Sequence, residues 1–350
     1  MKIFSPIKFK NLELKNRVVM APMCMYSAEN GLVNDFHLVH YATRAIGGVG
    51  LIIAEATGVV PEGRITNKCA GIWNDEQASA WQKIVEFIHH NTETKIGIQL
   101  GHAGRKASTW DGKQTSLEEN GWVTVAPSEI PYLEGERKPH ALSKVEISEV
   151  VNAFKEAAVR SVKAGFDVIE IHAAHGYLIS QFLSPLSNIR TDEYGGNLEN
   201  RARILLEIID AVNEVLNDNV PLFVRISATE YAENGWDVDD SVKLSKVLKE
   251  RGVDLIDVSS GGNISGAKIN VFPGYQVQFS NQIKHQSNVK TGTVGLITTL
   301  EQAEEILQKD EADLILLARK LLRSPYFVAE SSWQNKEESY FPKQYERGKI

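Results

Sequence analysis

Two histidines and a tyrosine stand close together in the segment His172-Ala173-Ala174-His175-Gly176-Tyr177. Two imidazole rings can donate hydrogen bonds to one substrate oxygen and so act as an electrophilic clamp. A phenol, whose ordinary pKa is about 10, keeps its proton at neutral pH and suits a general acid. The segment therefore predicts a site in which His172 and His175 polarise a substrate and Tyr177 donates a proton.

Other functions are compatible with the same residues. Histidines three residues apart could bind a metal in a lyase or hydrolase, but a catalytic zinc usually needs a third protein ligand. The chain has no His-Glu-x-x-His motif, and we predict no metal. Either histidine alone could simply cap the junction between a strand and a loop. A non-catalytic module that binds a phosphate-bearing ligand is a further alternative.

Eight short apolar runs could position these residues. Several are almost continuously apolar, which is typical of parallel strands covered on both faces. Amphipathic stretches of helical period lie between them, at 146–163, 198–216, 238–251 and 300–308. This alternation predicts an α/β protein with a single (β/α)₈ TIM barrel over residues 1–350, with a doubly wound sheet as the main competitor. The expected strands are 17–21, 51–56, 96–100, 168–172, 222–226, 255–259, 289–293 and 314–318.

Two connections are longer than a barrel requires, 101–144 after the third strand and 173–197 after the fourth. Loops this long usually serve a site, and both leave the carboxyl face, where barrel enzymes keep their catalytic residues. Backbone amides after the last two strands often hold a phosphate, and Arg319 could add a bidentate contact there. The strand ends bring to this face Cys24, Tyr26, Gln99, His102, Arg105, His172, His175, Tyr177, Arg225, Ser259, Ser260, Gly261, Gly295 and Arg319.

Composition narrows the class of partner. With 38 basic and 45 acidic residues the net charge is −7, which argues against nucleic acid or an anionic membrane as the main partner. No apolar run has the length of a membrane span, and the first residues lack the apolar core of a signal peptide. Only Cys24 and Cys69 are present, which excludes a disulfide framework and an all-cysteine iron–sulfur cluster. We expect a cytoplasmic protein that acts on a small molecule.

Longer motifs then follow one another along the chain. They are Ala-Pro-Met-Cys-Met-Tyr at 21–26, Gln-Leu-Gly-His-Ala-Gly-Arg-Lys at 99–106, Glu-Ile-His-Ala-Ala-His-Gly-Tyr-Leu at 170–178, Asn-Ile-Arg-Thr-Asp-Glu-Tyr-Gly-Gly at 188–196 and Tyr-Glu-Arg-Gly at 345–348. In these motifs the sequence resembles the old yellow enzyme family of FMN-dependent ene-reductases, and within it the bacterial NADPH dehydrogenase branch.

The resemblance implies roles for individual residues. The residues expected to bind FMN are Ala21, Pro22, Met23, Cys24, Ala56, Gln99 and Arg225, with Gly295, Ala318 and Arg319 around its phosphate. Substrate is expected to contact Tyr26, His172, His175 and Arg347, and Tyr177 is the implied proton donor. Arg347 belongs to a C-terminal segment of about 335–350 that, by the resemblance, reaches into a neighbouring subunit of a homodimer or homotetramer.

The resemblance also implies a reaction with two halves in one site. Hydride passes from NADPH to N5 of FMN, and then to the β-carbon of an activated alkene such as an enone, nitroalkene or quinone. His172 and His175 would bind the carbonyl or nitro oxygen while Tyr177 protonates the α-carbon. Such chemistry fits a role in the detoxification of electrophiles.

Overall fold

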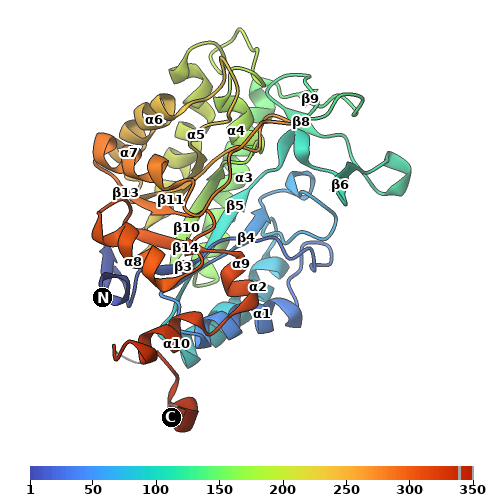
Figure 1. Ribbon diagram of the computed structural model, residues 1–350. Helices are drawn as coiled ribbons and strands as arrows, with labels where there is room; N and C mark the ends of the chain where they lie inside the picture. The colour runs from blue at the N-terminus through green and yellow to red at the C-terminus, as the bar shows by residue number, and fades with distance from the viewer. Residues whose placement is uncertain (338–339, 349–350) are drawn as a thin grey trace.

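The computed structural model describes residues 1–337 and 340–348, and eight parallel strands in it form a closed barrel surrounded by helices (Figure 1). Neighbouring strands follow the order β10-β11-β12-β13-β14-β3-β4-β5, which closes on itself. The predicted (β/α)₈ barrel is therefore confirmed. The strands are β3 (Val18–Met20), β4 (Leu51–Gly58), β5 (Lys95–Gly101), β10 (Val168–Ala173), β11 (Leu222–Ser227), β12 (Leu255–Ser259), β13 (Lys290–Thr293) and β14 (Leu314–Leu317).

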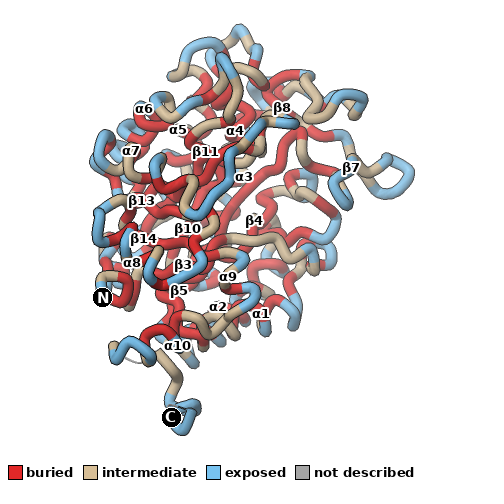
Figure 2. The backbone as a smooth tube through the Cα atoms, in the orientation of Figure 1, coloured by how far each residue is buried: buried red, intermediate tan, exposed pale blue. Residues whose placement is uncertain are grey.

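All eight predicted strands are present, with ends that differ by at most two residues from the predicted runs. Every residue of β3, β10, β11, β12 and β14 is buried, as the red interior of Figure 2 shows. One face of each strand packs inside the barrel and the other packs under the helices. This two-sided burial is the physical reason that the runs are almost continuously apolar.

The helices alternate with the strands as predicted, and the polar residues at their ends fix where they begin. Helix α3 starts two residues before the predicted 146–163, because Ser143 and Glu146 form a capping box. After α3 the chain turns at Gly165, whose φ of 91° is the left-handed conformation that glycine adopts without strain. The helices are α1 (Asp35–Ile46), α2 (Asp75–Asn91), α3 (Lys144–Lys163), α4 (Leu178–Leu183), α5 (Leu198–Asn213), α6 (Val238–Glu250), α7 (Val277–Ser287), α8 (Leu300–Gln308), α9 (Arg319–Arg323) and α10 (Phe327–Gln334).

A hairpin that the sequence analysis did not anticipate closes the amino end of the barrel. Strands β1 (Ile7–Phe9) and β2 (Leu12–Leu14) pair antiparallel and bury their apolar face against the first residues of the barrel strands. The ring of Phe9 lies 5.0 Å, centroid to centroid, from that of Phe223 in β11. The carboxyl end is thus the open end of the barrel.

Both long connections contain short elements. After β5 come the 3₁₀ turn η3 (Gly104–Lys106), β6 (Thr109–Trp110), β7 (Lys113–Gln114), η4 (Leu117–Glu119), β8 (Val125–Ala126) and β9 (His140–Ala141), and after β10 comes the buried helix α4. Further 3₁₀ turns are η1 (Lys2–Phe4), η2 (Pro61–Gly63) and η5 (Lys343–Gly348). Among the described residues, no helix is both long and apolar enough to cross a bilayer.

The C-terminal segment of about 335–350 is described in part. Residues 338–339 and 349–350 of this predicted segment lie outside the described residues. Tyr340 is anchored to the body of the protein, since its hydroxyl donates a hydrogen bond to the carbonyl oxygen of Phe4 at 3.0 Å. Turn η5 extends away from the barrel, at the bottom of Figure 1.

Truncation of the buried aromatic ring of the hairpin should strongly destabilise the folded protein. We expect Phe9→Ala to lower the free energy of unfolding by about 3–5 kcal/mol, because it removes a buried ring and leaves a cavity. Urea denaturation measures the loss. Lys8→Ala, on the exposed face of the same strand, is the control, and equal effects of the two changes would show that the hairpin does not plug the barrel.

Candidate active site

Two cavities lie at the carboxyl ends of the barrel strands. One is formed mainly by the residues after β13 and β14, and the other by those after β4, β5 and β10. Strand β3 lies between β14 and β4 in the barrel, so the segment 21–26 that follows it lies between the two cavities. The barrel thereby brings together the residues that the sequence analysis placed at this face.

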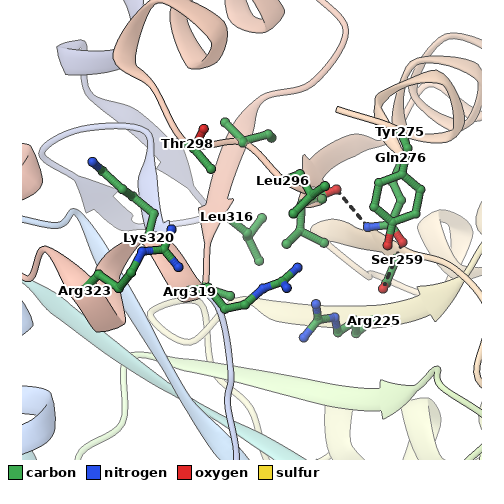
Figure 3. Close-up of a pocket in the computed structure, with 14 residues that line it drawn as sticks. Arg225, Ser259, Tyr275, Gln276, Leu296, Thr298, Leu316, Arg319, Lys320 and Arg323 are labelled. Atoms are coloured by element: carbon green, nitrogen blue, oxygen red, sulfur yellow. Dashed lines mark hydrogen bonds between the residues drawn. The ribbon is translucent and has the colours of Figure 1, made fainter. Parts of the chain in front are cut away.

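The first cavity is strongly cationic. It has a volume of about 220 Å³ and is lined by Arg225, Arg319, Lys320 and Arg323, while none of the described residues that line it carries a carboxylate. Figure 3 shows the guanidinium groups of Arg225 and Arg319 directed into the same space. Cations that converge on a cavity whose lining has no carboxylate favour an anionic ligand such as a phosphate.

The backbone around Gly295 shapes one wall of this cavity. Gly295 has a φ of 126°, and a Cβ atom there would come within 3.0 Å of the Tyr275 ring and of Gln276 Nε2. The Gln276 amide is fixed in turn, because its Nε2 donates a hydrogen bond to the Val294 carbonyl at 2.8 Å. Only glycine fits this position without strain. The structure therefore brings Gly295 together with Ala318 and Arg319, as predicted for the phosphate site.

A buried acidic pair lies in the barrel beside Arg225. Arg225 Nε is 3.0 Å from Asp257 Oδ2, although the two atoms lack hydrogen-bond alignment. Gln99, another predicted flavin-site residue, donates through Nε2 to Glu170 Oε1 at 2.8 Å. Burial, followed by the nearby charge of Asp257, raises the pKa of Glu170 to about 8, and burial raises that of Asp257 to about 6. Near neutral pH Glu170 is therefore largely protonated and Asp257 largely ionised, so Arg225 faces one negative charge.

His172 and His175 contact one another at the end of β10. His172 Nε2 is 3.3 Å from His175 Nδ1, and His175 Nε2 is 2.8 Å from Ser259 Oγ. The backbone N–H of Ala174 donates to His172 Nδ1 at 3.2 Å, which leaves the proton of the neutral ring on Nε2. The Nε2–H of His172 then donates to His175 Nδ1, which leaves the proton of the neutral His175 ring on its Nε2. Each neutral ring therefore has one N–H group that can donate a hydrogen bond.

Both imidazoles are uncharged at neutral pH. Burial, and then the positive charges of Arg225 and Lys106, lower the pKa of His172 well below its ordinary value, and the same groups act on His175. The Lys106 ammonium donates to the carbonyl oxygens of His175 at 2.8 Å and Gly262 at 2.7 Å. This lysine holds the His175 backbone, which has a left-handed φ of 59°, against the loop after β12.

Tyr177 faces the second cavity together with His172 and Ala56. The rings of His172 and Tyr177 are 4.9 Å apart between centroids and nearly perpendicular. Burial, and then the nearby Cys24 and Tyr26, raise the pKa of the Tyr177 phenol well above its ordinary value. The phenol therefore keeps its proton beside two neutral N–H donors, which is the arrangement that a general acid next to a hydrogen-bonding clamp requires.

The segment after β3 is held at both ends. The Ala21 N–H donates to the Leu317 carbonyl at 3.0 Å, and the Met25 N–H donates to Glu55 Oε2 at 3.1 Å. Pro22, Met23 and Cys24 between them are partly buried. Tyr26 has a left-handed φ of 50° and is 43% exposed, so its ring lies open at the mouth. The described structure thus places these five predicted residues at the mouth of the barrel.

Arg347 is the one predicted site residue that the described chain does not bring to the barrel mouth. It is exposed on η5 and lines neither cavity. In the same described residues, no group of three His, Cys, Asp or Glu side chains is close enough to hold a metal ion. The two histidines thus have no third protein ligand of these types in that part of the chain.

Several residues of the site were not identified from the sequence. Lys320 and Arg323 line the cationic cavity, and the Arg-Lys-x-x-Arg pattern at 319–323 places all three cations within one helical turn and a half. Lys106 stands in the motif at 99–106 but had no assigned role. The contacts of Glu55 and Asp257 have no local signal, because both acids lie within otherwise apolar strands.

Comparisons with known proteins agree with this geometry. Residues 2–337 match the model of the NADH:flavin oxidoreductase / NADH oxidase family. An NADPH dehydrogenase of Bacillus cytotoxicus is 53% identical over 353 residues, which cover 100% of this chain and 98% of the relative. Morphinone reductase in complex with tetrahydroNAD has a TM-score of 0.78 and 29% identity, over 97% of this chain and 92% of that one. 2-Naphthoyl-CoA reductase shares the fold, with a TM-score of 0.86 and 23% identity, over 96% of this chain and 52% of that one.

Because of their surroundings, we expect His172 and His175 to take up a proton only at a lower pH than an ordinary histidine does. We expect the rings of His172 and His175 to be neutral at pH 6.5, where an ordinary histidine is half protonated, because a lowered pKa favours the uncharged base. NMR of ¹⁵N-histidine-labelled protein measures this, with His172→Asn and His175→Asn to assign the signals. The urea-unfolded chain serves as the control with ordinary titration. Protonation of either ring near pH 6.5 in the folded protein would contradict the expectation.

Proposed function

This chain belongs to the NADH:flavin oxidoreductase / NADH oxidase family, and we propose that it oxidises NADPH and reduces the carbon–carbon double bond of an electrophilic alkene. Membership confirms the resemblance to the old yellow enzyme family, the oxidoreductase class, and FMN and a nicotinamide nucleotide as cofactors. The observation that carries the proposal is the grouping of two neutral imidazoles with a protonated phenol beside a cationic cavity.

The residues at the mouth fit FMN. A phosphate suits the cationic cavity, where Gly295, Ala318 and Arg319 would hold it. Arg225 would stabilise negative charge on the reduced ring system, and the residues Ala21, Pro22, Met23, Cys24, Ala56 and Gln99 would contact it. When bound, FMN supplies the centre that accepts hydride from NADPH and returns it to the substrate.

His172 and His175 would bind the oxygen of the substrate. A carbonyl or nitro oxygen can accept the His172 N–H in place of His175 Nδ1, and the His175 N–H in place of Ser259. Two donors that are already oriented and desolvated stabilise the enolate-like charge that develops on this oxygen. Their neutrality supports this role, because the N–H of a neutral imidazole is a much weaker acid than that of an imidazolium and donates a hydrogen bond without losing its proton to the substrate.

Tyr177 would supply the proton to the α-carbon, and Tyr26 would lie beside the bound substrate. Burial would keep the Tyr177 phenol protonated until a carbanion-like centre takes its proton, and a proton from solvent would then return to the phenolate. Enones, nitroalkenes and quinones share the required oxygen acceptor, and their reduction would detoxify reactive electrophiles.

The exposed C-terminal turn supports a shared site between subunits. Arg347 lies far from the cavities of its own chain on a turn that extends from the barrel, which is compatible with contact to a substrate in a neighbouring copy. We therefore propose a homodimer or a homotetramer built from such dimers.

The proposal is tested by the colour of the protein and its response to substrates. We expect purified protein to bind FMN, to bleach when NADPH is added without oxygen, and to regain its colour when an enone follows. Stopped-flow absorbance measures both steps. Bleaching that no enone, nitroalkene or quinone reverses would contradict the ene-reductase activity and leave the family assignment in place.

Removing the phenol should separate the two steps. We expect Tyr177→Phe to slow reoxidation by the alkene by about 10²-fold or more and to leave bleaching by NADPH nearly unchanged. Tyr231→Phe is the matched control, because its hydroxyl bonds Ser260 at 2.9 Å outside the clamp. Equal slowing of both steps in Tyr177→Phe would remove this residue from the acid role.

Removing one of the two proposed hydrogen-bond donors should weaken the binding and reduction of substrate more than the binding of FMN. We expect His172→Ala to slow alkene reduction by about 10²–10³-fold and to weaken the binding of phenols, with FMN retained. Titration of the flavin absorbance with a phenol measures the affinity. Normal phenol binding together with loss of FMN would show that His172 serves the cofactor instead.

A further inference from the structure

Lys106 lies against the ring of the proposed proton donor. Its Nζ atom is placed over the Tyr177 ring, 5.2 Å from the ring centroid. The ring of Tyr132, from the long connection that also carries Lys106, has its centroid 4.5 Å from the same nitrogen. Both distances are within the range of about 6 Å in which a cation is attracted to an aromatic face. The ammonium thus contacts the ring from which the proton would leave.

Backbone groups from two other loops fix this ammonium in place. Two of its three N–H groups donate to the carbonyl oxygens of His175, at 2.8 Å, and Gly262, at 2.7 Å. His175 belongs to the loop after β10 and Gly262 to the loop after β12, whereas Lys106 lies in η3 after β5. The position of Lys106 over Tyr177 is therefore set by the packing of three loops.

Lys106 carries a positive charge without an acidic partner. Burial, followed by the charge of Arg105, lowers the pKa of Lys106 to about 8, so most of this side chain is protonated near pH 7. In the described part of the chain no carboxylate forms an ion pair with it. Its charge is thus not neutralised by an acid and acts on the ring beneath it.

We propose that Lys106 stabilises the phenolate that forms on Tyr177 when this residue gives its proton to the α-carbon of the alkene. The inference rests on the proposed function and names the group that makes a buried phenol a sufficiently strong acid. Burial alone opposes a negative charge on Tyr177. That charge spreads over the phenolic oxygen and the ring, next to the ammonium, and unlike charges attract strongly where water is excluded.

Only one proton moves in this step. The O–H bond of Tyr177 breaks, a C–H bond forms at the α-carbon, and Lys106 keeps all of its protons. Because Lys106 acts through Tyr177, it is a positioning residue and not a catalytic one. The cation–π contact is present before and after the transfer, and the attraction grows as the ring becomes negative.

A change of pH can separate the charge of Lys106 from its backbone contacts. A neutral amine still has two N–H groups, which is the number that the His175 and Gly262 carbonyls accept. As the pH rises through the lowered pKa of Lys106, about 8, the cation is lost while both hydrogen bonds can persist. A role confined to holding His175 would not follow this titration, whereas stabilisation of the phenolate would be lost with the charge.

The first test follows reoxidation of the FMN-bound, NADPH-reduced protein by cyclohexenone, from about pH 7 to about pH 9.5, with stopped-flow absorbance. Wild type is compared with Lys106→Arg, since a guanidinium keeps its charge over this range. We expect the ratio of the Lys106→Arg rate to the wild-type rate to rise about 10-fold across it, because only the wild type loses the cation.

The rate ratio cancels the other groups that could titrate. Burial raises the pKa of Glu55 and of Glu170 to about 8, so both acids change charge in the same range. Both are present in the two proteins and affect the two rates alike. The same holds for the titratable and charged groups that face Lys106, which are Arg105, Tyr132, His172, His175 and Tyr177.

A second test removes the charge by substitution. We expect Lys106→Met to slow reoxidation about 10-fold at neutral pH, but less than about 3-fold when Tyr177→Phe is already present, because no phenolate then forms. Lys113→Met, in the exposed part of β7 on the same connection, is the control. Bleaching by NADPH and circular dichroism confirm that each variant holds FMN and is folded.

The outcomes distinguish this inference from the proposed function. A rate ratio that stays constant with pH, or equal slowing by Lys106→Met with and without the Tyr177 hydroxyl, would show that Lys106 only holds His175. If Tyr177→Phe still slows reoxidation selectively, the proposed function survives that result. Equal slowing of both steps in Tyr177→Phe would remove the acid itself, and the role of Lys106 with it.

Discussion

The pairing of β14 with β3 closes the barrel, and the whole site depends on it. Ile315, Leu316 and Leu317 pair in parallel with Val18, Val19 and Met20. The residue after β3 continues the contact, since the Ala21 N–H donates to the Leu317 carbonyl. This closure joins the beginning of the chain to its end, so that the loop with Cys24 lies next to the cations after β14. An open sheet of the same strands would leave these two groups at opposite edges.

Burial then gives the groups at the mouth their protonation states. The same removal from water lowers the pKa of His172 and His175 and raises that of Tyr177 and Glu170. Each of these groups is therefore neutral near pH 7, while Arg225 and Arg319 keep their charge at the cationic cavity. One side of the mouth can thus bind a phosphate and the other can donate hydrogen bonds and a proton.

Three residues at this mouth have strained backbone. Tyr26, His175 and Leu296 all have left-handed φ values, between 50° and 59°. None of them is a glycine or an asparagine, so each conformation costs free energy that the surrounding packing offsets. For His175 the offsetting contacts are visible, because Lys106 binds its carbonyl and Ser227 Oγ accepts its N–H at 2.8 Å. The proposed clamp would need this support to hold its place rigidly.

The sequence predicted the elements that have a local pattern. Strands such as 255–259 and helices such as 300–308 match the structure residue for residue, because buried parallel strands and amphipathic helices carry their signal in neighbouring residues. The segment 172–177 also indicated a candidate site, since three reactive side chains share one turn. The short hairpin at 7–14 was missed because two strands of three residues show too little alternation.

Residue types and their order along the chain were enough to indicate the barrel, the face that bears the site and the histidine–tyrosine group. Only the folded chain decided that Lys106 holds His175 and that Asp257 lies beside Arg225. The two partners of each pair lie far apart in the sequence, and their contacts arise from barrel closure and loop packing. Distance in space and loss of water set their pKa values, and neither quantity is written in the spacing of residues along a chain.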